Sequence, residues 1–370
     1  MSLKPTSISI LIVLAFSLVV RTQTTDKPVE QVRKNIQVLN GLPDSQLFLL
    51  MNFVGDSLGV QCDYCHVKGE KNPQTGEDTH LWEKDDKKEK LVAREMMRMV
   101  LDLNQNRFKR EAVVTCYTCH RGSTRPERMV PLPPRDLVKE ALQTLQTQKK
   151  VLPTAQEIVA KYLSVVGAKQ NSASSPIVMR GIVESRSISG ILEVSFKQPN
   201  KCLIKQTTAS HEVTTRGTNG ATAWLQTSKG ITPITGEGFR RSIAAIGVYN
   251  PIKVPDSVSN ATVTGTAKVN DRDAYVLTTE NSPTESMQFF FDVESGLLLR
   301  RINVTNTMLG PLNVQWDFSD YRDVNGLKLP FVIRTSNVAS YDTTIRRFTE
   351  IKIDPTIDDR IFDAPQTTSP

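Results

Sequence analysis

The chain has 370 residues, of which 39% are hydrophobic and 23% charged, and a formal net charge of +7. Single domains cluster around ~100–150 residues, so a chain of this length is expected to form two domains. The charge is spread along the chain, and the run at 83–90 mixes both signs, which is typical of a solvated surface. This distribution excludes a nucleic-acid-binding patch.

The first 25 residues have the pattern of an export segment. Lys4 precedes an apolar run at 8–20 that only two serines interrupt, and Arg21 closes the run. The run is shorter than the ~20 residues that span a bilayer. Residues 1–25 therefore predict a secretory signal peptide, with an uncleaved anchor as the second interpretation. Both interpretations place the protein in the periplasm or on the outer face of the inner membrane.

The next predicted element is an amphipathic helix at 45–57. From Leu47 to Val54, apolar residues recur at positions i, i+3, i+4 and i+7, and Met51 lies on the face that they form. A short connection that contains a glycine follows at 58–61. We expect it to turn the chain so that the Met51 face looks towards the residues that come next.

Two copies of Cys-x-x-Cys-His, at 62–66 and 116–120, are the most informative feature of the chain. In this motif both thiols become thioethers on a haem, and the adjacent imidazole reaches the iron. The sequence therefore predicts two covalently bound haem c groups. The residues that would hold them are Cys62, Cys65, His66, Cys116, Cys119 and His120.

Two other interpretations apply to the four motif cysteines. Paired Cys-x-x-Cys knuckles are a common structural zinc site, but the gap between these pairs is much longer than the usual ~15–20 residues. A thioredoxin-like dithiol is the other interpretation. Neither requires a histidine directly after each pair, so haem attachment is preferred.

A second amphipathic helix is predicted at 88–104, before the second motif. Its apolar stripe contains Val92, Met96, Met99, Val100 and Leu103. Met97 lies ~100° from Met96 around the helix axis and so falls off the stripe. Each haem needs a sixth iron ligand, and the candidates are Met51 for the first haem and Met96 or Met99 for the second. His80, in the loop between the motifs, is a weaker candidate.

The segments 57–66, 93–99 and 114–122 resemble the cytochrome c subunit of bacterial photosynthetic reaction centres. In that family a Met on the helix before the motif is the sixth ligand, so the resemblance implies Met51 for the first haem and Met96 for the second. It covers about residues 30–130, with two motifs where well-studied members carry four haems. It also implies redox partner proteins, including a membrane-bound electron-transfer complex.

Breaks in composition divide the rest of the chain. A cluster of prolines ends the helical dihaem domain, which is predicted at 26–135. A polar linker follows at 136–152. The second domain is predicted at 153–370, and it begins with a helix whose capping box pairs Thr154 with Glu157.

After that helix the sequence changes to short β-rich runs. They lie at 177–183, 191–196, 221–226, 261–269, 274–279, 287–292, 297–304, 313–321, 327–334 and 344–353. Hairpin turns are expected at Asn219-Gly220, Glu294-Ser295-Gly296 and Asn325-Gly326. The predicted fold class is α+β, an α-helical dihaem domain followed by a curved antiparallel sheet or half-barrel with a covering helix at 154–166.

The second domain resembles periplasmic lipoprotein-carrier folds through its strand pattern, with Phe291-Asp292, Gly296-Leu297-Leu298 and Asp320-Tyr321-Arg322. A curved sheet with one apolar face and few long helices to cover it either packs on the haem domain or keeps a cavity for an apolar or lipid-like ligand. We expect such a cavity because a proline-rich stretch and a polar linker argue against a large fixed interface between the domains. The fifth cysteine, Cys202, lies in a β-like segment and is expected to be buried, and His211 has no ligand context.

The predicted function is one-electron transfer through two haems with His and Met axial ligands. A Met ligand completes the coordination sphere, so an electron carrier is preferred over an enzyme. The alternatives are a dihaem peroxidase, which needs an open iron site, and a redox-linked module that binds an apolar ligand. The sequence offers no nucleophile elbow, phosphate loop or metalloprotease helix.

Overall fold

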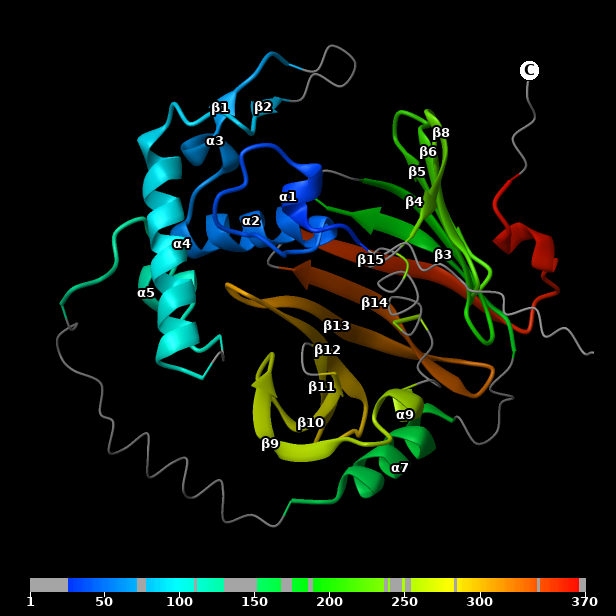
Figure 1. The fold of residues 1–370 in the computed structure, drawn as a ribbon. Coiled ribbons are helices and arrows are strands. Elements are labelled where there is room, and N and C mark those ends of the chain that lie inside the picture. The colour runs from blue at the N-terminus through cyan, green and yellow to red at the C-terminus, as the bar shows by residue number, and fades with distance from the viewer. Residues whose placement is uncertain are drawn as a thin grey trace, which may run out of the picture.

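The structure is a computed structural model, and it describes residues 26–71, 78–109, 112–129, 152–167, 175–185, 189–235, 239, 248–249, 254–282, 285–337 and 340–365. Helices dominate the first part of the chain and one large sheet dominates the second (Figure 1). The predicted export segment at 1–25 and nearly all of the predicted linker at 136–152 lie outside the described residues. Over the ranges above, no helix has the length and apolar character that a bilayer crossing needs.

The helical part contains five helices within the described residues. They are α1 (Val29–Val32), α2 (Asp44–Leu58), α3 (Cys62–Cys65), α4 (Lys88–Asn106) and α5 (Cys116–His120), and a small sheet pairs β1 (Val67–Lys68) with β2 (His80–Leu81). The two predicted amphipathic helices are confirmed as α2 and α4, each slightly longer than expected. Gly59 ends α2 in the left-handed region, at φ 69°, where a residue without a Cβ is favoured.

The core of the helical part forms where α2 and α4 pack together. It contains Leu50 and Phe53 from α2 and Met97 and Val100 from α4, all less than a tenth exposed. The buried face of α4 also carries Lys90, Arg94 and Asn104, and together with Met97 and Val100 these residues follow one another at intervals of three or four. This face is rotated from the apolar stripe that the sequence predicts, because polar side chains occupy part of the buried side.

The second part is built on a 13-stranded antiparallel sheet. Its strands are β3 (Ile177–Glu184), β4 (Ser189–Lys197), β5 (Lys201–Thr208), β6 (Val213–Thr218), β7 (Ala223–Thr227), β8 (Gly230–Ile234), β9 (Thr262–Val269), β10 (Arg272–Ser282), β11 (Glu285–Asp292), β12 (Leu298–Thr307), β13 (Gly310–Val324), β14 (Leu327–Asn337) and β15 (Ser340–Ile353). Neighbours in sequence pair as hairpins, except that β8 and β9 lie at opposite edges of the sheet and β15 pairs with β3 as well as with β14. The antiparallel sheet and the three predicted hairpin turns are confirmed.

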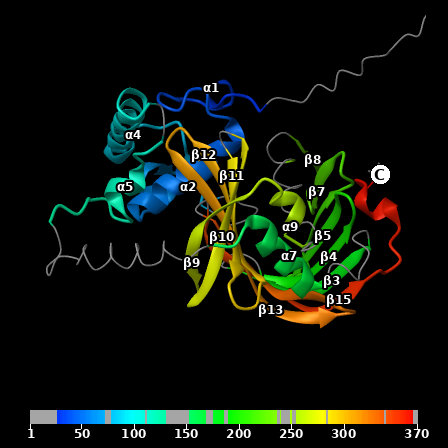
Figure 2. The ribbon, with the colours of Figure 1, turned by 90° about the horizontal axis from the view of Figure 1, so that it is seen from below.

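Short helices cover the concave side of this curved sheet. Figure 2 shows the strands curving round α7 (Ala155–Val166) and α9 (Val254–Ser257). The side chains of Ile158, Tyr162 and Val166 in α7 are buried against the sheet, and the Tyr162 ring lies 5.3 Å from the ring of Phe291. A 3-10 turn, η2 (Asp359–Phe362), follows β15. The predicted covering helix is therefore confirmed.

The capping box at the start of α7 is also present. Glu157 N donates to Thr154 Oγ1 at 3.2 Å, and Thr154 N donates to Glu157 Oε2 at 2.7 Å. We expect Thr154→Ala to lower the free energy of unfolding by ~1 kcal/mol, because the hydroxyl that accepts from Glu157 N is lost while the bond from Thr154 N to Glu157 remains. Urea denaturation measures this, with Ser164→Ala, an exposed site within α7, as the neutral control.

The two parts of the chain meet at the β12–β13 hairpin. The tip residue Leu309 is fully buried, and together with Leu312 it belongs to the same hydrophobic cluster as Leu50 and Phe53 of α2. Met308 packs against the edge of this cluster. The sheet therefore packs on the helical part at this hairpin, which is the alternative to the preferred expectation of no large fixed interface.

A small cavity lies between the covering helices and the concave side of the sheet. It measures about 10 Å³, and Tyr162, Phe289, Arg301 and Tyr321 are part of its wall. A drug-sized ligand needs ~300 Å³ or more. This cavity is too small for the predicted lipid-like ligand.

Candidate cofactor sites

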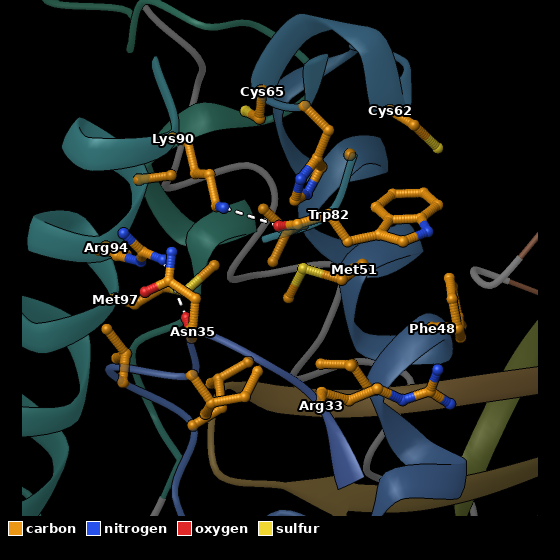
Figure 3. Close-up of a pocket in the computed structure, with 18 of the residues that line it drawn as sticks. Arg33, Asn35, Phe48, Met51, Cys62, Cys65, Trp82, Lys90, Arg94 and Met97 are labelled. Carbon is orange, nitrogen blue, oxygen red and sulfur yellow. Dashed lines mark hydrogen bonds between the residues drawn. The ribbon is translucent and has the colours of Figure 1, made fainter. Parts of the chain in front are cut away.

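The first candidate site is a cavity of about 400 Å³ between α2, α3, α4 and the chain before α2 (Figure 3). Met51, Cys62, Cys65 and His66 all line it. Figure 3 shows Met51 reaching in from α2 while the two cysteines lie at one end. The four residues that the sequence assigns to the first haem are therefore brought to one cavity.

Local structure explains how the first motif is presented. Residues 62–65 form a single helical turn, and a spacing of three places both cysteines on the same side of it. His66 leaves the turn in an extended conformation, while its N–H still donates to Cys62 O at 2.9 Å. The left-handed Gly59 reverses the chain between α2 and this turn, which sets Met51 across the cavity from the motif.

The His66 imidazole is suited to binding a metal. Burial above all, together with the nearby charge of Lys90, lowers its pKa to about 4, so the ring is neutral at pH 7. Its Nδ1 is buried and has no hydrogen-bond partner among the described residues. Neutral imidazole is the form that coordinates metals. The side chain thus fits the role of an iron ligand.

An aromatic cluster covers the outer side of His66. The ring of Trp82 lies edge-on to His66 at 4.9 Å and stacks on His80 at 4.8 Å. Trp82 lines the first cavity, whereas His80 lines neither cavity. His80 is therefore placed behind Trp82 and away from the position of an axial ligand.

Two buried cations form part of the wall of the first cavity. Lys90 and Arg94, each 8% exposed, lie 3.0 and 2.9 Å from Asp85 Oδ1. Lys90 Nζ also donates to Trp82 O at 2.7 Å, and Arg94 Nη2 donates to Asn35 O at 3.0 Å. Hydrogen bonds, first of all from Arg94, hold the pKa of Asp85 well below its usual range.

These cations correct the sequence-based assignment of residues 83–90 to a solvated surface. Lys90 belongs to that run, yet its side chain is buried among Asp85 and backbone carbonyls. The alternation of signs gave no indication of this burial. A usable signal was the spacing of Lys90, Arg94 and Met97 at i, i+4 and i+7, which places them on one face of a helix.

The second candidate site is a cavity of about 320 Å³ beside α4 and α5. Cys116, Cys119 and His120 line it together with the whole predicted stripe of α4, Val92, Met96, Met99, Val100 and Leu103. The stripe predicted for α4 thus faces the second motif. Met97, which the sequence places off the stripe, is 8% exposed and lines both cavities.

The second motif is held at both of its ends. Before it, Asn104 of α4 exchanges two hydrogen bonds with Val114, Nδ2 to O at 2.7 Å and N to Oδ1 at 2.9 Å. After it, Gly122 N donates to Ser57 O of α2 at 2.9 Å. Burial raises the pKa of the Cys116 thiol.

The His120 ring is oriented by a backbone carbonyl. Its Nδ1 lies 2.8 Å from Ser123 O, so a protonated Nδ1 donates to that oxygen. This bond fixes the tautomer and leaves Nε2 as the nitrogen with a lone pair for a metal.

The two cavities share a wall. Five residues line both of them, Val54, Leu58, Cys65, Ala93 and Met97. Cofactors in the two sites would therefore be neighbours. In the described part of the chain, no group of three or more His, Cys, Asp and Glu side chains could hold a metal ion, so the four cysteines do not converge as a zinc site would require.

The two remaining residues singled out in the sequence lie in the sheet. Cys202 in β5 is 3% exposed, and burial raises its pKa to about 12. It is an inert, buried thiol, as predicted. His211 is an exposed residue in the turn between β5 and β6, far along the chain from both motifs.

Comparisons with known proteins agree with the motifs. Residues 15–162 match the family described as photosynthetic reaction centre cytochrome C subunit. Among curated relatives, the subunit of Roseobacter denitrificans is 30% identical over 107 residues, 27% of each chain. The subunit of Thermochromatium tepidum is 32% identical over 108 residues, 28% of this chain and 24% of the relative. This chain matches about a quarter of the length of these relatives, and the resemblance is confirmed for its first part.

Solved structures resemble the second part only weakly. A DUF1329 family protein from Desulfovibrio piger has a TM-score of 0.42 and 13% identity, and covers 56% of this chain and 97% of its own. A LolA superfamily protein from Nitrosomonas europaea has a TM-score of 0.38 and 14% identity, with 58% and 99% covered. No functional conclusion follows from a likeness at this level.

Proposed function

Because residues 15–162 match the cytochrome c subunit family of photosynthetic reaction centres, we propose that the protein is an exported dihaem c-type cytochrome that transfers single electrons. The observation that supports this most strongly is the pairing of motifs with methionines. Each of two adjacent cavities is lined by one Cys-x-x-Cys-His motif and by a Met from the helix before it.

The residues have distinct roles in this proposal. Cys62 and Cys65 anchor the first haem, and Cys116 and Cys119 anchor the second. A bound haem supplies an iron that changes reversibly by one electron. The chain would supply the iron ligands, His66 and Met51 for the first haem and His120 and Met96 for the second.

The thioether ligands decide what kind of reaction the sites support. A Met sulfur favours the reduced iron and raises the reduction potential. An iron that took one His and one Met from the chain would have no open site for peroxide. This argues for an electron carrier and against a dihaem peroxidase.

The shared wall places the two haem sites next to each other, so that electrons could pass between them. Val54, Leu58 and Met97 separate the cavities with apolar side chains, which exclude water between them. Two haems held as neighbours by the same chain can pass electrons directly from one to the other. We propose that electrons enter at one haem and leave at the other.

Export and partners belong to the same proposal. The apolar run at 8–20 supports delivery to the periplasm or to the outer face of the inner membrane. The family match supports redox partner proteins there, among them a membrane-bound electron-transfer complex.

We expect the full chain, produced with haem-attachment machinery, to keep two haems through acid-acetone extraction. This treatment removes a haem that is held only through its iron, but it does not break thioether bonds. Cys62→Ala with Cys65→Ala should lose one haem, and Cys116→Ala with Cys119→Ala the other. Cys202→Ala, at a buried thiol outside both sites, is the matched control and should keep both. Mass spectrometry of the intact chain counts the haems.

Two outcomes would contradict the proposal. Tightly bound zinc without haem would favour a structural metal site. A change in the reduced spectrum on adding carbon monoxide or cyanide would indicate an open iron and a peroxidase-type site.

A further inference from the structure

The tip of the β12–β13 hairpin touches the start of the second motif. A Cβ built on Gly310 would lie 2.8 Å from Thr115 Cγ2 and 3.2 Å from Phe53 Cζ. Gly310 has φ 140°, and its neighbour Leu309 is fully buried in the helical core. The backbone of the tip therefore approaches so closely that a side chain at position 310 would force its neighbours to move.

The residue that the tip touches governs how the motif helix begins. Thr115 is the N-cap of α5, and it directly precedes Cys116. Thr118 N donates to Thr115 Oγ1 at 3.3 Å, and Thr115 N donates to Thr118 Oγ1 at 3.0 Å. A displacement of Thr115 would therefore shift the helix that carries the second motif.

The tip has a defined shape of its own. Thr307 Oγ1 donates to Gly310 O at 2.7 Å, and Leu309 N donates to Thr307 Oγ1 at 3.4 Å. These bonds close the turn across the hairpin. Leu309 therefore enters the helical core from a turn that is stabilised by its own hydrogen bonds.

Three separate elements hold the second motif. Asn104 of α4 binds Val114 before it, Ser57 of α2 binds Gly122 after it, and the hairpin tip packs on Thr115. Only the third of these comes from the β part of the chain. The first motif is held differently, because the side-chain ammonium of Lys87 donates a hydrogen bond to Asp63 O in α3.

We propose that the β12–β13 tip is a positioning element for the second haem site. Leu309 and Gly310 hold Thr115 and with it α5, and so set how His120 is presented to the iron. The tip touches the second motif directly but meets the first site only through the packing of α2, so the second haem is expected to respond to the tip more strongly than the first. This inference rests on the proposed function, because it concerns the haem that the second motif would attach.

The test compares two buried leucines in the full chain with its haems attached. Leu309→Ala truncates the tip, and Leu327→Ala makes the same truncation at a 1% exposed site in the core of the sheet. Spectroelectrochemical titration measures the midpoint potential of each haem. Leu309→Ala is expected to shift the potential that is lost in the Cys116→Ala, Cys119→Ala variant more than the other potential, and Leu327→Ala to leave both unchanged.

The opposite results are distinct. If Leu309→Ala folds by circular dichroism and carries two haems at wild-type potentials, or shifts the potential of the first haem as much as or more than that of the second, the inference is wrong. If it does not fold, Leu309→Val, which removes one methylene, is judged by the same criteria. Wild-type protein without haem would instead contradict the proposed function and leave no second potential to assign.

Discussion

Replacing Met51 by alanine is expected to remove about half of the Met-to-iron charge-transfer absorbance of the oxidised protein and to lower one reduction potential. Met96→Ala should do the same to the other haem. The physical reason is that a thioether stabilises the reduced iron, so its loss favours the oxidised state. Optical spectra and redox titration of each variant measure the effect, with haem content as the check that attachment is intact.

Two neighbouring methionines serve as controls for the second haem. Met96 and Met99 line the same cavity and are similarly exposed, at 41% and 45%, so the resemblance to the family is the ground for choosing Met96, and Met99→Ala should leave the absorbance intact. Met97 is buried between the cavities, and Met97→Ala should cost ~2–5 kcal/mol of stability without removing the absorbance. If either variant loses the charge-transfer signal and Met96→Ala retains it, the assignment of the second ligand is wrong.

A second large effect is expected at Gly59, where α2 meets the turn after the second motif. A Cβ at this position would lie 2.2 Å from Gly122 O, and the residue already has φ 69°. Gly59→Ala combines the strain of a left-handed conformation with a backbone overlap, so we expect a loss of ~2–5 kcal/mol. Chemical denaturation of the haem-loaded protein measures it.

Gly41 provides the matched control for this prediction. It has φ 83°, and a Cβ there would meet nothing within 4 Å. Gly41→Ala should therefore cost only the conformational strain of ~1–2 kcal/mol. Equal losses in the two variants would mean that the Gly59–Gly122 contact contributes nothing to stability.

Local patterns predicted the elements that carry the two sites. The period of apolar residues at Leu47, Leu50 and Val54 indicated α2, and the Thr154–Glu157 pair indicated α7. The motif spacing named the residues that line the two cavities. These features depend on neighbours within a few positions, and for that reason a single sequence contains them.

Features that depend on distant segments were missed or wrong. The burial of Lys90 and Arg94 follows from Asp85 and from carbonyls of other loops, and a mixed run of charges does not encode it. The strands β6 and β8 are rich in Thr and Gly and have no clear alternation of buried residues, so no period indicated them. The insertion of Leu309 into the helical core requires two parts of the chain to meet, which no local pattern reports.

The place of β15 in the sheet has a consequence for the order of assembly. The hairpins from β3 to β8 and from β9 to β14 each pair neighbours in sequence, so each half can form from local contacts. Only β15 joins the halves, and it does so by pairing Ile353 with Ile177, across most of the domain. Closing so long a loop costs entropy before any contact is gained, so joining is the slow step. The strand that comes last in the chain is thus the one that makes two half-sheets into a single folding unit.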